Sequence, residues 1–163
     1  MSHVTTVTSP HAQRASTKPQ GCTNLQLRQL TRRVSQRYDA AMALVGLKTT
    51  QYSLLSFVIT LGPVRPADLA QAMEMDPSTL TRNLKPLIAA GWVQLAAGAD
   101  GRSRAITATA AGRLKRAEAQ SHWKQAQLQL NQTLGESRVL ALHALIQESL
   151  ALLSTSESGV DHD

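Results

Sequence analysis

The sequence is poor in the residues that build cross-linked, metal-binding or base-stacking proteins. It has one cysteine among 163 residues, which excludes an intrachain disulfide and a zinc site made of several cysteines. Aromatic residues make up only 3%, so there are few side chains on which single-stranded bases could stack. The longest strongly apolar run, residues 52–61, is far shorter than the roughly 20 residues of a membrane-spanning helix. No signal-peptide pattern is visible, and we expect a cytoplasmic protein.

The charge of the protein is strongly positive and unevenly distributed. The formal net charge is +6 and the isoelectric point is about 10.1, which favours an anionic partner such as nucleic acid or a membrane surface. Lys and Arg outnumber Asp and Glu by seven to one in residues 1–62 and by eight to four in residues 63–116, whereas residues 117–163 carry two basic and six acidic residues. The basic charge therefore lies in the first two thirds of the chain.

Two short amphipathic segments, residues 66–73 and 78–91, have the pattern of a helix-turn-helix. Asp76 is a good N-cap for the second segment, and Pro77 suits its first helical position. Gly91 can adopt the left-handed conformation that ends a helix. The apolar positions repeat at three- and four-residue intervals: Leu69, Ala70, Met73, Leu80, Leu84, Leu87 and Ile88.

A hairpin is predicted directly after these segments. Residues 92–95 are strand-like, residues 96–101 contain two glycines and an aspartate typical of a hairpin tip, and residues 102–109 can return as the second strand. Thr109 can cap the next helix, with Gly112 inside its first turn. A helix-turn-helix followed by a hairpin is a winged helix.

These motifs resemble the MarR family of transcription regulators. The run Asp100-Gly101-Arg102-Ser103, followed by Ile106, Thr109 and Gly112, is similar to the wing signature of that family. The pairs Leu69-Ala70 and Thr81-Arg82 and the turn at residues 90–93 also have the family's spacing. The resemblance covers roughly residues 22–154.

The chain departs from the family pattern at two positions. Ala108 replaces a larger aliphatic residue, so we expect looser packing of the wing. Pro86 lies inside the recognition helix, where it cannot donate a hydrogen bond to the Arg82 carbonyl and should kink or loosen the helix. We expect altered docking on DNA but not its loss.

Long helices are predicted on both sides of the winged part. Residues 23–45, 110–134 and 139–153 carry apolar side chains at helical spacing. A further helix, capped by Thr49 or Thr50 and ended by the Gly62-Pro63 pair, should buttress the helix-turn-helix. The apolar stripe of the last helix is wider than one partner would cover, which favours burial against a second copy; a monomeric helical cap is the alternative.

The predicted fold class is therefore mainly α, an α+β winged helix-turn-helix with long N- and C-terminal helices. Residues 22–154 should form one MarR-like domain, with residues 22–48 and 113–154 as dimerisation helices and residues 49–112 as the DNA-binding part. Residues 1–21 should be a disordered tail and residues 155–163 an acidic one.

Polar side chains on the recognition helix are the first candidate DNA contacts. Arg82 suits the O6 and N7 atoms of guanine through its planar fork, whereas Lys85 and the hydroxyls of Ser78, Thr79 and Thr81 suit phosphates. Each of these residues could instead be an ordinary surface residue.

The wing supplies the second set of candidate contacts. The resemblance implies that Arg102 enters or follows the minor groove, where Asp100 braces its guanidinium. Arg104 on the returning strand is a further candidate contact. The alternative for the Asp100-Gly101 pair is an ordinary turn.

The predicted function is a homodimeric DNA-binding transcription regulator, a repressor of a pseudo-palindromic operator. The family resemblance implies release by a small phenolic or anionic ligand, bound between the winged part and the dimer helices, or by oxidation. An architectural DNA-binding protein without an effector is the alternative. No catalytic constellation or cofactor motif is present, so an enzyme is not expected. His122 and His143 could approach one another as zinc ligands, but solvent-facing or packing roles are favoured.

Cys22 precedes the first predicted helix, and a helix N-terminus favours the reactive thiolate. The peroxide-sensing branch of the family has a reactive cysteine near the start of this helix. Oxidised Cys22 could stop at sulfenic acid, take a small-thiol cap or bond to another subunit. An inert buried thiol is the other reading, and both remain open.

Overall fold

The computed structural model describes residues 20–97 and 104–157 and contains, within them, six helices and one antiparallel pair of strands. The elements follow in the order α1 (Thr23–Ala43), α2 (Thr49–Leu61), α3 (Pro66–Ala72), α4 (Pro77–Ala89), β1 (Val93–Ala97), β2 (Arg104–Ala108), α5 (Ala110–Leu134) and α6 (Glu136–Glu157). The mainly α class, with a winged helix-turn-helix between long terminal helices, is confirmed. None of the described helices is both long and apolar enough to cross a membrane.

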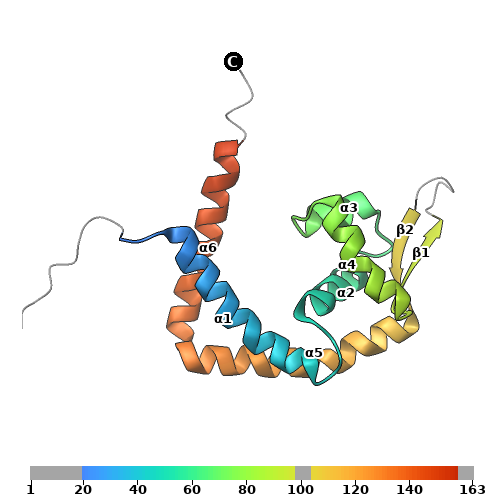
Figure 1. Ribbon diagram of the computed structural model, residues 1–163, viewed down its shortest axis with the longest axis horizontal. Coiled ribbons are helices and arrows are strands. Elements are labelled where there is room, and N and C mark those ends of the chain that lie inside the picture. Colours follow the sequence, from blue (N-terminus) through green and yellow to red (C-terminus); the bar gives the residue numbers. More distant parts are fainter. Residues whose placement is uncertain (1–19, 98–103, 158–163) are drawn as a thin grey trace, which may run out of the picture.

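The elements form two parts, a winged part and a helical arm, and one end of α5 reaches from the arm to the winged part. The winged part consists of α2, α3, α4, β1 and β2, and the helical arm consists of α1, α5 and α6. Figure 1 shows α5 running from the winged part to the arm, where α1 packs along it and α6 turns away at a steep angle. Gly135, with a φ of 84°, separates α5 from α6 and permits this turn.

The core of the winged part is built around α2. Leu54, Leu55 and Val58 on α2 are at most 1% exposed, and they pack against the helix-turn-helix and the hairpin. Their partners include Leu69, Leu80, Leu84, Leu87, Val93 and Ile106. The predicted buttress is confirmed, and each fully buried side chain of this size stabilises the fold by roughly 1.5–3 kcal/mol.

The predicted ends of the recognition helix α4 are confirmed. The Asp76 carboxylate accepts a hydrogen bond from the Thr79 N–H at 2.9 Å, and Pro77 occupies the first helical position. Gly91 follows the helix with a φ of 71°. Pro86 lies inside α4, and the helix continues past it to Ala89.

The start of α5 is fastened to the start of the hairpin. Thr109 Oγ1 accepts from the Gly112 N–H at 3.0 Å, which confirms the predicted cap, and donates to the Gly91 carbonyl at 2.6 Å. Gly112 packs directly on the backbone, because a Cβ at this position would lie 2.0 Å from the Trp92 carbonyl oxygen. The winged part and α5 therefore meet through backbone contact.

The predicted cap of α2 is wrong. Thr49 is the first residue of the helix, and neither Thr49 nor Thr50 caps it. The Gln51 side chain accepts from the Lys48 N–H at 2.8 Å, and Asp39 of α1 accepts from the Thr49 N–H at 3.1 Å. A tertiary contact between α1 and α2 thus replaces the local threonine cap.

The last helix is longer than predicted. It continues to Glu157, into the segment expected to be an acidic tail. Its final turn accommodates polar residues because the hydroxyls of Ser154 and Thr155 donate to the carbonyl of Ala151 within the helix. The remainder of that tail and residues 1–19 lie outside the described residues.

Candidate nucleic-acid interface

The recognition helix α4 separates apolar and polar side chains onto opposite faces. Leu80, Leu84 and Leu87 are buried against the winged core. Most of the predicted contact residues lie on the exposed face, namely Ser78, Thr81, Arg82 and Lys85, whereas Thr79 is half-buried. Four of the five predicted side chains on this helix are therefore accessible to a ligand.

Asp76 organises the first turn of this surface. Its carboxylate accepts from Ser78 Oγ at 2.5 Å and from Thr79 Oγ1 at 2.6 Å. These hydrogen bonds, from Ser78 first and then Thr79, hold the pKa of Asp76 well below its usual range. Both hydroxyl protons are donated to Asp76 in the protein alone, and the hydroxyl oxygens remain able to accept.

The two cations of α4 are not paired with carboxylates in the part of the chain that the structure describes. Arg82 Nη2 has a long contact of 3.5 Å to Thr79 Oγ1, a neutral partner. The two ion pairs among the described residues are Arg65–Asp68 and Lys115–Glu118. The charge of Arg82 and Lys85 is thus available to an anionic ligand.

A second cation, which was not predicted from the sequence, lies beside Arg82. Lys48, Thr50 and Gln51 at the start of α2 share a hollow of about 230 Å³ with Arg82 and Asn83 of α4. Lys48 and Arg82, which are 34 positions apart in the sequence, therefore border one concave surface. A lysine directly before a predicted helix was the only signal in the sequence, and it does not reveal this proximity.

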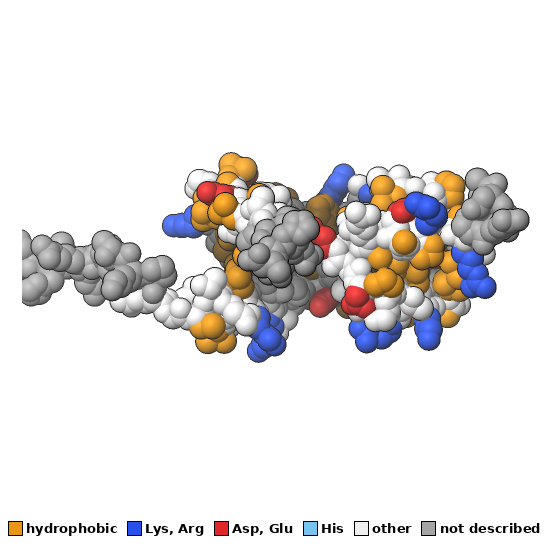
Figure 2. Space-filling view, turned by 90° about the horizontal axis from the view of Figure 1, so that it is seen from above, with side chains coloured by type: hydrophobic (Ala, Val, Ile, Leu, Met, Phe, Trp, Pro, Cys, Tyr) orange, Lys and Arg blue, Asp and Glu red, His pale blue; other side chains and the backbone are white. Residues whose placement is uncertain are grey.

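The wing contributes Arg104 to the described surface. The strands pair in antiparallel register from Val93↔Ala108 to Ala97↔Arg104, so Arg104 lies at the end nearest the hairpin tip, with its side chain exposed. Asp100 and Arg102 lie outside the described residues. Figure 2 shows Lys and Arg side chains around the edge of the winged part, with apolar side chains between them.

The remaining candidates lie elsewhere. Cys22 directly precedes α1 and is exposed in the single chain, as are all of residues 20–29, so the expected burial of its thiol is not found within one chain. His122 and His143 border two different hollows of the helical arm. Among the described residues, no group of three or more His, Cys, Asp or Glu is arranged to hold a metal ion.

Helices α3 and α4 with the β1–β2 hairpin define a winged helix-turn-helix protein. The model of the MarR family matches residues 45–103. The transcriptional regulator MosR of M. tuberculosis, crystallised in complex with DNA, is 32% identical, with 81% of this chain and 98% of that chain covered and a TM-score of 0.67. The chain belongs to the MarR family.

Two further proteins are similar to this chain, one in fold and one in part of its sequence. A mutant MarR of E. coli complexed with operator DNA shares the fold, with a TM-score of 0.73 at 17% identity, over 78% of this chain and 92% of that chain. An uncharacterized HTH-type transcriptional regulator of Bacillus subtilis, YwoH, is 29% identical over 84 residues. That match spans 52% of this chain and 61% of the B. subtilis protein. MosR and YwoH are both named as transcriptional regulators.

Proposed function

We propose that the protein is a homodimeric transcription regulator that binds a pseudo-palindromic DNA operator and acts as a repressor. The observation that carries this proposal is the exposed cationic face of α4, where Arg82 and Lys85 have no carboxylate partner among the described residues. The relatives MosR and MarR, which share this fold, were crystallised with DNA.

The recognition helix would enter the major groove with its exposed face toward the bases. Arg82 would donate two parallel hydrogen bonds to guanine, and Lys85 would neutralise a phosphate. Lys48 would hold a second phosphate in the hollow beside Arg82. Ser78 and Thr79 donate their hydroxyl protons to Asp76, so these hydroxyls would donate to a phosphate only after leaving the Asp76 carboxylate. The Thr81 hydroxyl donates to the Pro77 carbonyl of its own helix at 2.8 Å and is not held by Asp76.

The wing would contact the flanking minor groove. Arg104 on β2 is exposed beside the hairpin tip, and Arg102, braced by Asp100, would extend the contact into the groove. Narrow A·T-rich minor grooves have an enhanced negative potential that attracts such arginines.

The helical arm would hold two copies together. Val139 is the one buried hydrophobic residue of α6, and large apolar side chains remain uncovered along it, with Leu140 70% and Leu152 65% exposed. A mostly apolar hollow of about 260 Å³ between α1, α5 and α6 includes Leu142 and Ile146 of α6. A soluble monomer rarely exposes so much contiguous apolar surface, so residues 22–48 and 113–154 would form the dimer interface.

The test of DNA recognition starts from random-sequence DNA selected on the wild-type protein. We expect a two-fold related consensus and a local footprint. Arg82→Ala should weaken binding to the selected DNA by about 1–3 kcal/mol and relax the preference at one base pair of each half-site. Arg28→Ala, an equal charge change on exposed α1, should leave the base preference at every position of the half-site unchanged.

Other outcomes of this experiment would count against the proposal. Uniform coating of DNA by the wild type would favour the architectural alternative, and recovery of no DNA would contradict DNA binding altogether. Lys48→Gln serves as a phosphate-contact variant. It should weaken binding to all DNA sequences alike and reduce the slope of log affinity against log salt concentration by about one.

Release of the operator would come from a small phenolic or anionic ligand or from an oxidant. Exposed Cys22 is accessible to peroxide, and oxidation would add a polar group or a cap at the start of α1. We expect mild peroxide to lower operator affinity at least tenfold in the wild type and to leave Cys22→Ser bound. Equal release of both proteins, or of neither, would exclude Cys22 as the sensor and leave a ligand as the effector.

A further inference from the structure

The recognition helix carries a proline on its exposed face. Pro86 lies inside α4 and follows Arg82 by four residues, so the two exposed side chains lie on one side of the helix. Both border the hollow of about 230 Å³ beside the start of α2. The other described residues that line this hollow are polar or charged, namely Lys48, Thr50, Gln51 and Asn83. Pro86 therefore supplies an apolar surface within a polar hollow.

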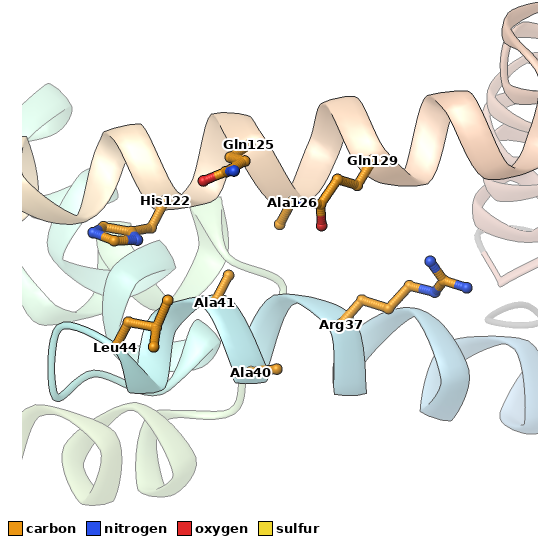
Figure 3. A pocket seen from close by; sticks show the side chains of 8 residues that line it. All are labelled: Arg37, Ala40, Ala41, Leu44, His122, Gln125, Ala126 and Gln129. Atoms are coloured by element: carbon orange, nitrogen blue, oxygen red, sulfur yellow. The ribbon is translucent and has the colours of Figure 1, made fainter.

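This surface lies outside the residues proposed for the dimer interface. Arg82, Asn83 and Pro86 all belong to α4, which is part of the proposed DNA-binding residues 49–112. The hollow between α1 and α5, by contrast, is bordered by Arg37 and His122 of the arm (Figure 3). The proposed assembly therefore leaves the exposed face of α4 free to meet DNA.

Pro86 weakens its own helix and gains no burial in return. The proline nitrogen has no hydrogen to donate to the Arg82 carbonyl, and a proline ring inside a helix costs stability. Pro86 is exposed and is not among the described residues of the winged core. Natural proteins break such local rules of stability at functional sites. The position therefore indicates a role for the ring outside the fold of the single chain.

Chemistry limits what this ring can recognise in a major groove. The proline side chain has no hydrogen-bond donor or acceptor, whereas the base edges present mainly donors and acceptors. The exception is the 5-methyl group of thymine, which accepts apolar contact. A proline ring packed on any other base edge would desolvate polar groups without replacing their hydrogen bonds. Thymine is therefore the base that fits Pro86.

We propose that Pro86 selects a thymine in each half-site by apolar contact with its 5-methyl group. Four residues of α-helix advance about 6 Å, and successive base pairs are about 3.4 Å apart. The thymine should therefore lie one or two base pairs from the guanine that Arg82 would bind. This inference rests on the proposed function, because it requires α4 to enter the major groove.

Removing the methyl group alone tests this contact. In the operator selected on the wild-type protein, each thymine is replaced in turn by deoxyuridine, which keeps every hydrogen-bonding group of the base. At one thymine of each half-site, loss of the methyl contact should weaken wild-type binding about fourfold, and about fifteenfold when both half-sites are changed. The base pair at which Arg82→Ala relaxes the preference identifies the guanine from which the distance is counted.

Two variants separate the proline ring from other sources of methyl sensitivity. Pro86→Ser restores the helical N–H and removes the ring, so it should bind the thymine and deoxyuridine operators with nearly equal affinity. Pro66→Ser, the same change at the exposed first residue of α3, should keep the wild-type ratio of the two affinities.

The outcomes distinguish the contact from the wider function. Equal wild-type binding with deoxyuridine at every thymine would contradict the Pro86 contact and leave DNA recognition intact. The contact is also contradicted if Pro86→Ser retains the wild-type ratio, or if the sensitive thymine lies more than two base pairs from the guanine. If no DNA sequence is selected at all, the proposed function fails and the contact fails with it.

Discussion

At the scale of single residues, Asp76 connects the stability of the recognition helix with the chemistry of its surface. One carboxylate caps α4 and also holds the hydroxyls of Ser78 and Thr79. The side chains best placed to meet a phosphate at the helix start are therefore already engaged in the protein alone. A phosphate bound by these two hydroxyls would have to compete with the cap.

The depressed pKa of Asp76 predicts a pH dependence of stability. The folded state binds the proton of this carboxyl less readily than the unfolded chain, whose aspartates titrate near pH 4. The stabilisation is fully present above about pH 4 and is lost as the pH falls below it. In urea unfolding between about pH 4 and pH 2, the wild type should lose free energy of unfolding more steeply than Asp76→Asn, and parallel curves would contradict the cap's role.

Single-residue signals predicted the ends of helices well where the partner lies close in sequence. Asp76, Pro77 and Thr109 act on backbone groups within three residues, so the chain itself reveals their role. Lys48 was not predicted as a site residue, because its neighbour Arg82 lies on another helix. The same limitation explains the wrong cap of α2, which Asp39 influences from a position ten residues away.

At the scale of elements, the hairpin and α5 meet in a close backbone contact. Gly112 lies against the Trp92 carbonyl, and Thr109 donates its N–H to the same carbonyl at 3.0 Å. Lys115, about one helical turn after Gly112, places its Nζ 5.7 Å from the ring centroid of Trp92. The orientation of α5 relative to the wing is therefore fixed by several contacts to one residue.

Gly112→Ala should destabilise the protein by about 1–3 kcal/mol or more, because the added Cβ overlaps backbone that cannot move independently. Thermal or urea unfolding measures the loss. Ala111→Ser, at the exposed neighbouring position, should stay within about 0.5 kcal/mol of the wild type. Equal stability of Gly112→Ala and the wild type would mean that the junction is looser than described.

Sequence periodicity predicted the helices of the arm but not how they pack against one another. The stripe from Val139 to Leu153 correctly indicated a final helix, yet Val139 is its one buried hydrophobic residue. Periodicity indicates which apolar side chains favour burial, but it does not identify the partner surface that buries them. The hollows of the arm lie between different helices, so no pattern within one helix reveals them.

At the scale of the whole molecule, the apolar surface of α6 predicts an assembly that depends on this helix. Leu150→Glu should raise the dimer dissociation constant at least tenfold, or about 1.4 kcal/mol, because a charge would be buried in the interface. Leu61→Glu, at a leucine of α2 that is 43% exposed and lies outside the proposed interface, is the matched control. Sedimentation or light scattering at micromolar concentration measures both, and a dimeric Leu150→Glu protein would contradict the proposed interface.

The length of α5 gives small motions in the arm a large effect at the other end. This helix has 25 residues without interruption, or about 37 Å of rod, and it is fastened to the hairpin at Gly112. Such a rod works as a lever: a tilt of roughly 10° about its far end displaces the winged part by about 6 Å. Two levers in a dimer would double that displacement, against an ideal separation of about 34–36 Å between successive major grooves. In the proposed dimer, a tilt of that size beside Gly135 would therefore move a recognition helix out of register with its half-site.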